Sequence, residues 1–219
     1  DLVREAEAKG TPLVPAGTGA HAYLGNPPPE GATVVSLRRF DRVLRYEPGD
    51  FTVGVQAGLH LRTLRETLEK NGQEVPVDFA LDPRGTVGGL VAAAQPCARR
   101  GRHGPVRAHV IGMHAVRCGP DGPSIYKTGG MVVKNVAGYE VMKLLAGSLG
   151  TAGPILEVNF KLRPLPERRS SRLAAFATRE KAWELAEALR ARTLEPAALW
   201  VLEGEAAHEL ARRCPGTEG

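Results

Sequence analysis

A glycine-rich stretch at residues 84–112, RGTVGGLVAAAQPCARRGRHGPVRAHVIG, constrains this chain more than any other segment. Thr86 can cap a helix, and the following GGLVAAA supplies small side chains for its first turns. A helix that begins without bulky side chains is expected to expose free backbone N–H groups, which bind phosphate well. A cationic turn follows at 99–104, and VRAHVIGMHAV then predicts a strand or a pair of strands. The pattern indicates either backbone held close to a large anionic cofactor or a glycine-rich turn without a ligand.

A second glycine-rich segment lies near the N-terminus. Residues 17–22, GTGAHA, match the GxGxxA pattern of a Rossmann turn, which needs a helix directly afterwards. Prolines 27, 28 and 29 follow instead, and a helix cannot pass through them. We therefore predict a glycine loop between two strands, at 11–15 and 32–37. Its consecutive N–H groups can form an anion-binding nest, with a plain surface loop as the alternative.

Composition narrows the classes of function. The net charge of +5 is spread along 219 residues, and aromatic residues make up only 5% of them. These features favour an anionic ligand over nucleic acid or a membrane surface.

Cys97, Cys118 and Cys214 lack CxxC spacing, which argues against a disulfide framework, a metal site or an iron–sulfur cluster in this chain. Without a signal peptide or transmembrane segment, a cytoplasmic location is expected, with attachment to the inner membrane through partners as the alternative.

Sequence periodicity predicts α and β elements along most of the chain. A helix is expected at 2–9, and another at 59–71 with Leu61, Leu64 and Leu68 on one buried face. Strands at 40–46 and 51–56 are predicted to form a hairpin through the turn at 47–50. Further strands are predicted at 124–127 and 155–162, and a short helix at 139–145.

The composition changes after Pro166. A strand at 173–177, a helix at 179–192, a strand at 197–202 and a helix at 205–213 give the order expected for half of a ferredoxin-like fold. Because two strands alone form a marginal sheet, this region is expected to be truncated or completed by a partner.

Four segments, taken in order, resemble the FAD-binding domain of the vanillyl-alcohol oxidase (PCMH) superfamily. They are LVPAGTGAHAYLG, EPGDFTVGVQAGLHLRTLRETLEKNGQEVPVDF, RGTVGGLVAAAQPCARRGRHGPVRAHVIGMHAV and KNVAGYEVMKLLAGSLGTAGPILEVNFKLRPLP. The stretch GGMVVKNVAGYEVMKLLAGSLG most resembles GlcE-type FAD-binding subunits of glycolate oxidase. The resemblance implies an α+β fold, with a PCMH-type domain of two α+β subdomains at 1–166 that hold FAD between them. The start of a ferredoxin-like α/β cap domain would follow at 167–219.

The resemblance also implies that FAD is bound mostly by main chain, which is why the side chains are small. Residues 16–20 would wrap the pyrophosphate, and residues 86–89 would approach it from the second subdomain. Pro76 and Asp78 fall where the family places backbone against the flavin, and Ile155 falls beside the flavin or adenine. The implied cofactor-binding residues are Ala16, Gly17, Thr18, Gly19, Ala20, Pro76, Asp78, Thr86, Val87, Gly88, Gly89 and Ile155.

Some departures from the family pattern bear on the chemistry. Certain relatives attach FAD covalently through a histidine directly after the glycine pair, where this chain has Ala20 and then His21. Non-covalent FAD is therefore expected. Cys97 is interpreted as a packed small residue, with a thioether attachment point or redox thiol as the alternative.

Replacing Gly88 with Val is expected to abolish FAD retention while leaving the fold largely intact.

The function implied by the resemblance is that of an FAD-binding subunit in a glycolate oxidase complex. Its partners would be a companion FAD-binding catalytic subunit, an iron–sulfur subunit that receives the electrons, and a small 2-hydroxy acid, glycolate, oxidised to glyoxylate. No catalytic residue is assigned, because the family's substrate-binding side chains come largely from the cap domain. The alternatives are a self-sufficient FAD-dependent dehydrogenase of the D-lactate type and a flavin-free structural subunit.

Overall fold

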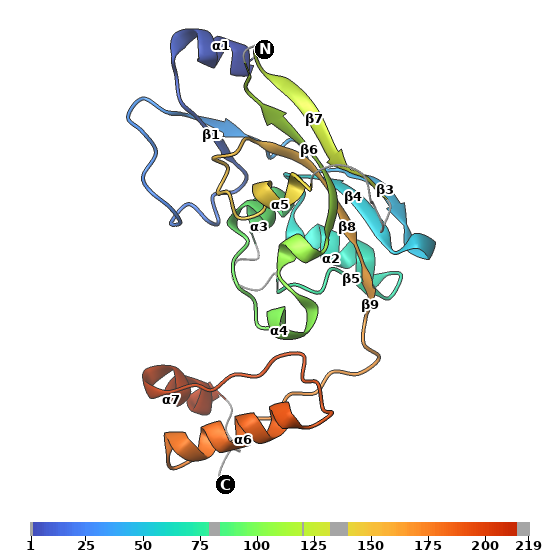
Figure 1. Cartoon of the computed structure of the whole chain (residues 1–219), viewed down its shortest axis with the longest axis vertical. Coiled ribbons are helices and arrows are strands. Elements are labelled where there is room, and N and C mark those ends of the chain that lie inside the picture. The colour runs from blue at the N-terminus through green and yellow to red at the C-terminus, as the bar shows by residue number, and fades with distance from the viewer. Residues whose placement is uncertain (1, 79–83, 120, 132–139, 214–219) are drawn as a thin grey trace. The chain divides into compact units, whose positions relative to one another are not determined.

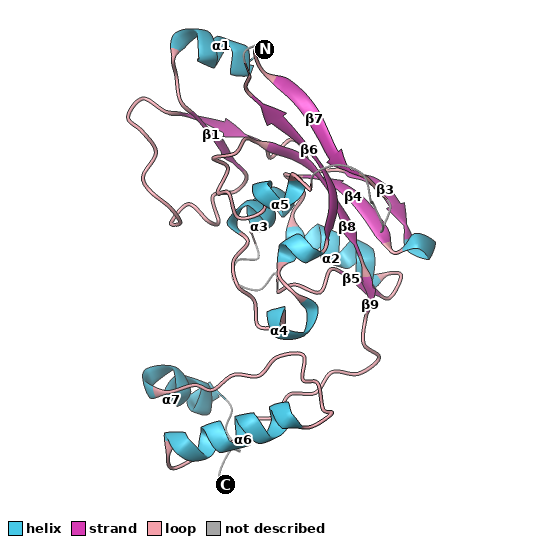
Figure 2. Ribbon diagram, in the orientation of Figure 1, coloured by secondary structure: helices cyan, strands magenta, loops and turns pink. Residues whose placement is uncertain are grey.

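The computed structural model describes residues 2–78, 84–119, 121–131 and 140–213 (Figures 1 and 2). The chain forms two compact units, one made of residues 1–97 and 104–165 and the other of residues 98–103 and 166–219. Residues 132–139, within the stretch that most resembles the glycolate oxidase subunits, lie outside the described residues. Of the helices described, none combines the length and the apolar character needed to cross a membrane.

The first unit begins with a helix and a parallel pair of strands. Helix α1 (Leu2–Lys9) is followed by strands β1 (Leu13–Ala16) and β2 (Thr33–Ser36), which run parallel with Leu13 opposite Thr33. Between the two strands the chain forms turns and bends without a helix. Both predicted strands and the rejection of a Rossmann turn are therefore confirmed.

A five-stranded antiparallel sheet forms the centre of the first unit, in the order β3-β4-β8-β6-β7. Its strands are β3 (Val43–Glu47), β4 (Thr52–Gln56), β6 (Val110–Arg117), β7 (Ser124–Gly129) and β8 (Ile155–Lys161). The 3₁₀ turn η1 (Pro48–Asp50) joins β3 to β4, which confirms the predicted hairpin. A second 3₁₀ turn, η2 (Val106–Ala108), leads into β6.

Helices cover one face of this sheet and enclose the core (Figures 1 and 2). They are α2 (Leu61–Glu69), α3 (Val87–Ala93) and α5 (Met142–Leu145). On α2 the predicted leucine stripe is confirmed, since Leu61, Leu64 and Leu68 are all buried. Such a fully buried leucine stabilises the fold by about 2 kcal/mol. A small antiparallel pair, β5 (Gln73–Glu74) and β9 (Arg163–Pro164), closes the unit beside α2.

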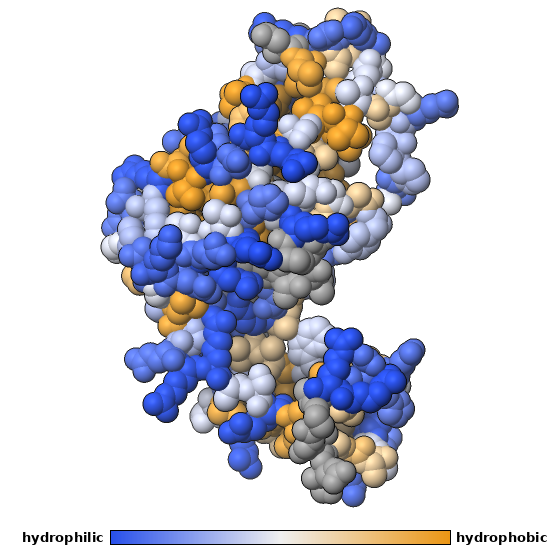
Figure 3. Space-filling model, turned by 180° about the vertical axis from the view of Figure 1, so that it is seen from behind, coloured by the Kyte–Doolittle hydropathy of each residue, from blue (hydrophilic) through white to orange (hydrophobic). Residues whose placement is uncertain are grey.

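The opposite face of the sheet carries polar side chains. In one row across four strands, Lys127 pairs with His114, His114 with Glu157, and Glu157 with Gln56. His114 Nδ1 and Glu157 Oε2 form a half-buried hydrogen-bonded pair. Seen from behind, the molecule shows mostly hydrophilic side chains with hydrophobic patches between them (Figure 3).

The described residues of the second unit form three helices, α4 (Arg100–His103), α6 (Arg179–Ala191) and α7 (Gly204–Arg213). The predictions of α6 and α7 are confirmed, and Thr178 caps α6 by accepting from the Lys181 N–H. The strands expected at 173–177 and 197–202 are wrong, because both segments are irregular in the structure. A sheet of only two short strands is marginal unless it packs against other elements, as β1–β2 and β5–β9 do in the first unit.

Candidate functional site

A small cavity lies where the loop after β1, the start of α3 and the start of β8 meet. Its volume is about 70 Å³. The residues that line it are Pro15, Ala16, Gly17, Leu37, Ala57, Thr86, Gly88, Gly89, Ala92, Leu149, Gly150, Gly153 and Ile155. None of these side chains is ionisable. Because one water molecule needs roughly 10–15 Å³ of such volume, the cavity has room for a phosphate-sized group.

The loop at residues 17–20 is fixed against the segment that precedes α3. The Thr18 hydroxyl donates to the Arg84 carbonyl oxygen over 2.7 Å. Gly17 lies so close to α3 that a Cβ atom on it would stand 2.4 Å from Thr86 Oγ1. Gly19 has a φ of +78°, a left-handed conformation that favours glycine. The two glycine-rich segments are thus in direct contact, although Gly17 and Val87 are 70 residues apart in the sequence.

The backbone donors of this loop are available to a ligand. Across the described chain, the N–H groups of residues 17–20 find no acceptor in the protein. The loop is nevertheless ordered at both ends, since Leu37 N–H donates to the Ala16 oxygen and Ala22 N–H donates to the Gly19 oxygen. Consecutive free donors in a fixed loop are the physical requirement of an anion nest.

The start of α3 is different, because its donors are already used. The N–H groups of Val87 and Gly88 donate to the Leu59 and Ala57 oxygens over 2.9 and 2.7 Å. The Gly89 N–H donates to Thr86 Oγ1 over 3.3 Å, so the predicted Thr86 cap is confirmed. The expectation of free N–H groups at this helix start is wrong, because the first turn docks onto the chain after β4 through main-chain hydrogen bonds.

Gly88 is required by packing. A Cβ atom there would lie 2.9 Å from the Ala57 Cβ and 3.1 Å from the Ala57 oxygen. A valine would therefore collide with the chain that follows β4, so we expect Gly88→Val to destabilise the fold, where the sequence alone predicted that the fold would stay intact. The small side chain at this position lets α3 approach its own domain.

The predicted cofactor-binding residues fall into four groups. Ala16, Gly17, Thr86, Gly88, Gly89 and Ile155 line the cavity. Thr18, Gly19 and Ala20 continue the loop beside it, while the Val87 side chain is buried in the core. Pro76 is buried and Asp78 half-buried after β5, and neither lines the cavity.

Several lining residues were not predicted from the sequence. Gly150 and Gly153, with φ of +84° and +119°, belong to a glycine cluster whose conformation only the fold reveals. Ala57 and Leu37 follow strands β4 and β2, where small and apolar residues carry no distinctive pattern. A search for glycines just before a predicted strand would have found the pair at 150 and 153.

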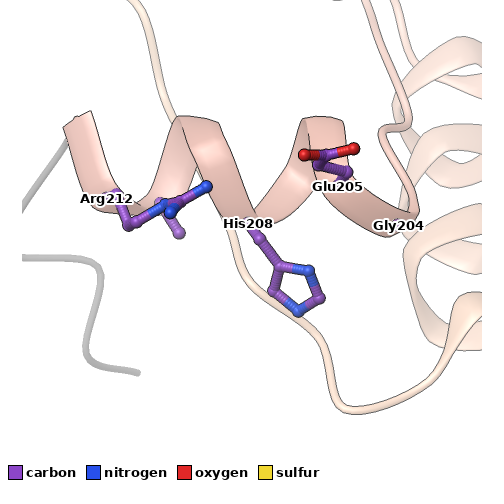
Figure 4. A pocket seen from close by; sticks show the side chains of 5 residues that line it. Gly204, Glu205, His208 and Arg212 are labelled. Atoms are coloured by element: carbon purple, nitrogen blue, oxygen red, sulfur yellow. The ribbon is translucent and has the colours of Figure 1, made fainter.

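Other features of the described residues offer no comparable site. A broad hollow beside α7 is lined by Gly204, Glu205, His208, Ala211 and Arg212, all from that one helix, so it lacks a second wall (Figure 4). No described His, Cys, Asp or Glu residues form a group of three that could hold a metal ion. Burial raises the pKa of Tyr46 and of Tyr126, and neither tyrosine lines the cavity.

Comparisons with known proteins agree with the fold and with FAD as the cofactor. A family model described as FAD binding domain matches residues 1–128, and the chain belongs to this family. Over 192 residues it is 31% identical to glycolate oxidase subunit GlcD of Bacillus subtilis, covering 88% of this chain and 40% of that protein. Over 188 residues it is 31% identical to glycolate oxidase subunit GlcE of Escherichia coli, covering 85% and 52%. The chain thus spans about half, or less, of these relatives' length.

A solved structure shares the fold at lower sequence identity. The structure of an alkyldihydroxyacetonephosphate synthase aligns with a TM-score of 0.61 and 24% identity, over 76% of this chain and 32% of that one. This chain therefore shares the fold of one part of a larger protein of known structure.

The residues present fit the pyrophosphate part of FAD, the cofactor that defines the family. Four consecutive backbone donors at 17–20 suit an anionic group, and the cavity beside them has a phosphate-sized volume of about 70 Å³. Because the lining carries no ionisable side chain, this cavity offers no general acid or base.

Proposed function

We propose that this chain is the FAD-binding part of an oxidoreductase of small 2-hydroxy acids, and specifically an FAD-binding subunit of a glycolate oxidase complex. The proposal depends mainly on one observation, the loop of free N–H groups beside a phosphate-sized cavity in a chain of the FAD-binding family. Relatives named as subunits of glycolate oxidase support the substrate and the complex.

The chain's own residues bind and orient the cofactor without a covalent bond. The N–H groups of 17–20 hold the pyrophosphate, and Ile155 supplies an apolar wall of the cavity. Pro76 and Asp78 remain the predicted contacts of the flavin. When bound, FAD supplies the redox chemistry by accepting a hydride from the carbon that bears the substrate hydroxyl and releasing electrons to an iron–sulfur partner.

Substrate-binding groups come, in this proposal, from outside the cavity. Glycolate is an anion, and its oxidation needs a cation to hold the carboxylate and a base to take the hydroxyl proton. The cavity lining provides neither, and the described residues hold no cluster suited to a metal. A companion FAD-binding subunit is therefore proposed to carry catalysis, with an iron–sulfur subunit as electron acceptor and a cytoplasmic location for the complex.

Absorption spectroscopy of the purified full chain tests this proposal. Visible flavin bands that pass into the supernatant after acid precipitation would support non-covalent FAD. The holoprotein, alone and with its companion subunits, is then mixed anaerobically with glycolate, and bleaching that requires the companions would support the complex. A folded chain that is colourless and takes up no added FAD would contradict the proposal and favour a flavin-free structural subunit.

A second function has support from the comparisons. The chain is 31% identical over 194 residues to the D-lactate dehydrogenase of Anaerostipes hadrus, covering 40% of that protein. Bleaching of the holoprotein by D-lactate, without companion subunits and faster than by glycolate, would favour a self-sufficient dehydrogenase.

A further inference from the structure

We propose that His21 is a titratable ligand of the FAD pyrophosphate, so that this chain binds FAD more tightly at acid than at alkaline pH. The inference rests on the proposed FAD site, and it assigns to a side chain a task that the family resemblance gives mostly to main chain. It applies to binding and not to the redox step.

The first observation is the position of the ring. His21 directly follows the loop of free donors at 17–20, and its Nδ1 lies 3.4 Å from where a Cβ atom on Gly89 would stand. Gly89 itself lines the phosphate-sized cavity. The Nδ1–Cε1 edge of the ring therefore packs against Gly89, one of the glycines in the cavity wall.

The second observation is the balance of charge around the bound anion. None of the residues that line the cavity carries an ionisable side chain. The first N–H groups of α3 cannot help, because they are already bonded to protein oxygens. A pyrophosphate held by the loop alone would keep its negative charges without a cationic partner. His21 is half-buried, and its imidazole is an ionisable side chain that lies against Gly89 in the cavity wall.

The neighbouring charged groups leave this role to the histidine. The facing segment of α3 contributes Thr86 and Gly89, which are uncharged. Before α3 comes Arg84, whose carbonyl oxygen accepts from Thr18 and which has further interactions of its own. On the histidine's own loop the carboxylate is Glu30, an exposed residue next to β2.

The chemistry sets the direction of the pH effect. A neutral imidazole offers a single N–H donor, whereas imidazolium offers two donors and a positive charge. Histidine is the side chain whose charge ordinarily changes between about pH 5 and about pH 8. Binding an anion next to imidazolium is more favourable than binding it next to the neutral ring. FAD affinity is therefore expected to rise as the pH falls through this range.

The experiment measures FAD binding by the full-length apoprotein at about pH 5.5 and about pH 8, from the change in flavin fluorescence. His21→Ala is expected to weaken FAD binding about tenfold at the lower pH, the usual size of a lost charge-assisted hydrogen bond. His21→Gln keeps a neutral donor, so it should bind FAD with little pH dependence. ADP, which shares the pyrophosphate but lacks the flavin, should show the same pattern when it competes with FAD.

A matched control tests whether the loss of any other histidine has the same effect on FAD affinity and on its pH dependence. His208 lies on α7 in the second unit, and His208→Gln should bind FAD like the wild type at both pH values. Equal affinity and equal pH dependence in the wild type and both His21 variants would overturn the proposal while leaving the FAD site in place. A wild type that binds neither FAD nor ADP would overturn the proposed function and, with it, this inference.

Discussion

Two glycine-rich segments meet at the cavity, and they use their glycines in opposite ways. At 17–20 the backbone N–H groups have no acceptor within the described protein, and glycine lets the loop adopt a left-handed turn beside Thr86. At the start of α3 the N–H groups are bonded, and Gly88 lets the helix approach Ala57. One segment is open to a ligand, and the other is engaged by its own fold.

The difference shows that a run of glycines does not by itself mark a phosphate site. Both segments have the composition of an anion-binding turn, and both line the same cavity. What separates them is whether nearby carbonyl oxygens take up the donors, as the Ala57 and Leu59 oxygens do for α3. The variants below test this contrast, from the largest expected loss to the smallest.

The largest effect is expected for Gly88→Val. The branched side chain must displace Ala57, whose carbonyl oxygen also accepts from the Gly88 N–H over 2.7 Å. We expect the free energy of unfolding of the full chain to fall by about 3 kcal/mol in chemical denaturation. Gly49→Val is the control, because no atom lies within 4 Å of a Cβ built on that exposed glycine. Equal stability of the two variants would show that Gly88 is not packed as described.

A smaller loss is expected for Gly17→Ala. Its new Cβ would lie 2.4 Å from Thr86 Oγ1, so the loop or the cap must move, at a cost of about 2 kcal/mol. The double variant Gly17→Ala/Thr86→Ala removes the nearest atom, so its loss should be less than the sum of the two single losses. Strict additivity in this double-mutant cycle would contradict direct contact between the two segments.

Gly19→Ala tests backbone conformation without a clash. No atom lies within 4 Å of a Cβ built on Gly19, yet its φ of +78° disfavours alanine. We expect a loss of about 1.5 kcal/mol in the free energy of unfolding. Gly19→Asn should cost less, because asparagine tolerates left-handed backbone better. An alanine variant as stable as the wild type would mean that the loop does not hold this turn.

The smallest effect is expected for the helix cap. Thr86→Ala removes the hydroxyl that accepts from the Gly89 N–H, and the unfolding free energy should fall by about 1 kcal/mol. Thr86→Ser keeps this acceptor and should recover most of the loss. Similar destabilisation by serine and alanine would indicate that the methyl group, not the cap, is what matters.

Local sequence patterns were sufficient to predict most of the first unit. The leucine stripe of α2, the hairpin of β3 and β4, and the Thr86 cap follow from spacing and residue type alone. They could be predicted because each depends on residues close together in the chain. The family resemblance placed the two glycine-rich segments together, and the structure brings them into contact.

What sequence reasoning missed depends on contacts between distant residues. The carbonyl oxygens that accept from the first N–H groups of α3 belong to Ala57 and Leu59, about 30 residues earlier, and no local sequence pattern predicts this pairing. In the second unit, strand-like segments at 173–177 and 197–202 remain irregular, since β propensity cannot form a sheet without partner strands.

Amide hydrogen exchange, resolved by residue in the full chain with and without FAD, tests the central claim most directly. Without FAD, the N–H groups of residues 87–90 should already be protected, while those of 17–20 exchange quickly. Addition of FAD should slow exchange at 17–20 and leave 87–90 nearly unchanged. Slow exchange gained at 87–90, with none gained at 17–20, would contradict the account and return the pyrophosphate to the start of α3.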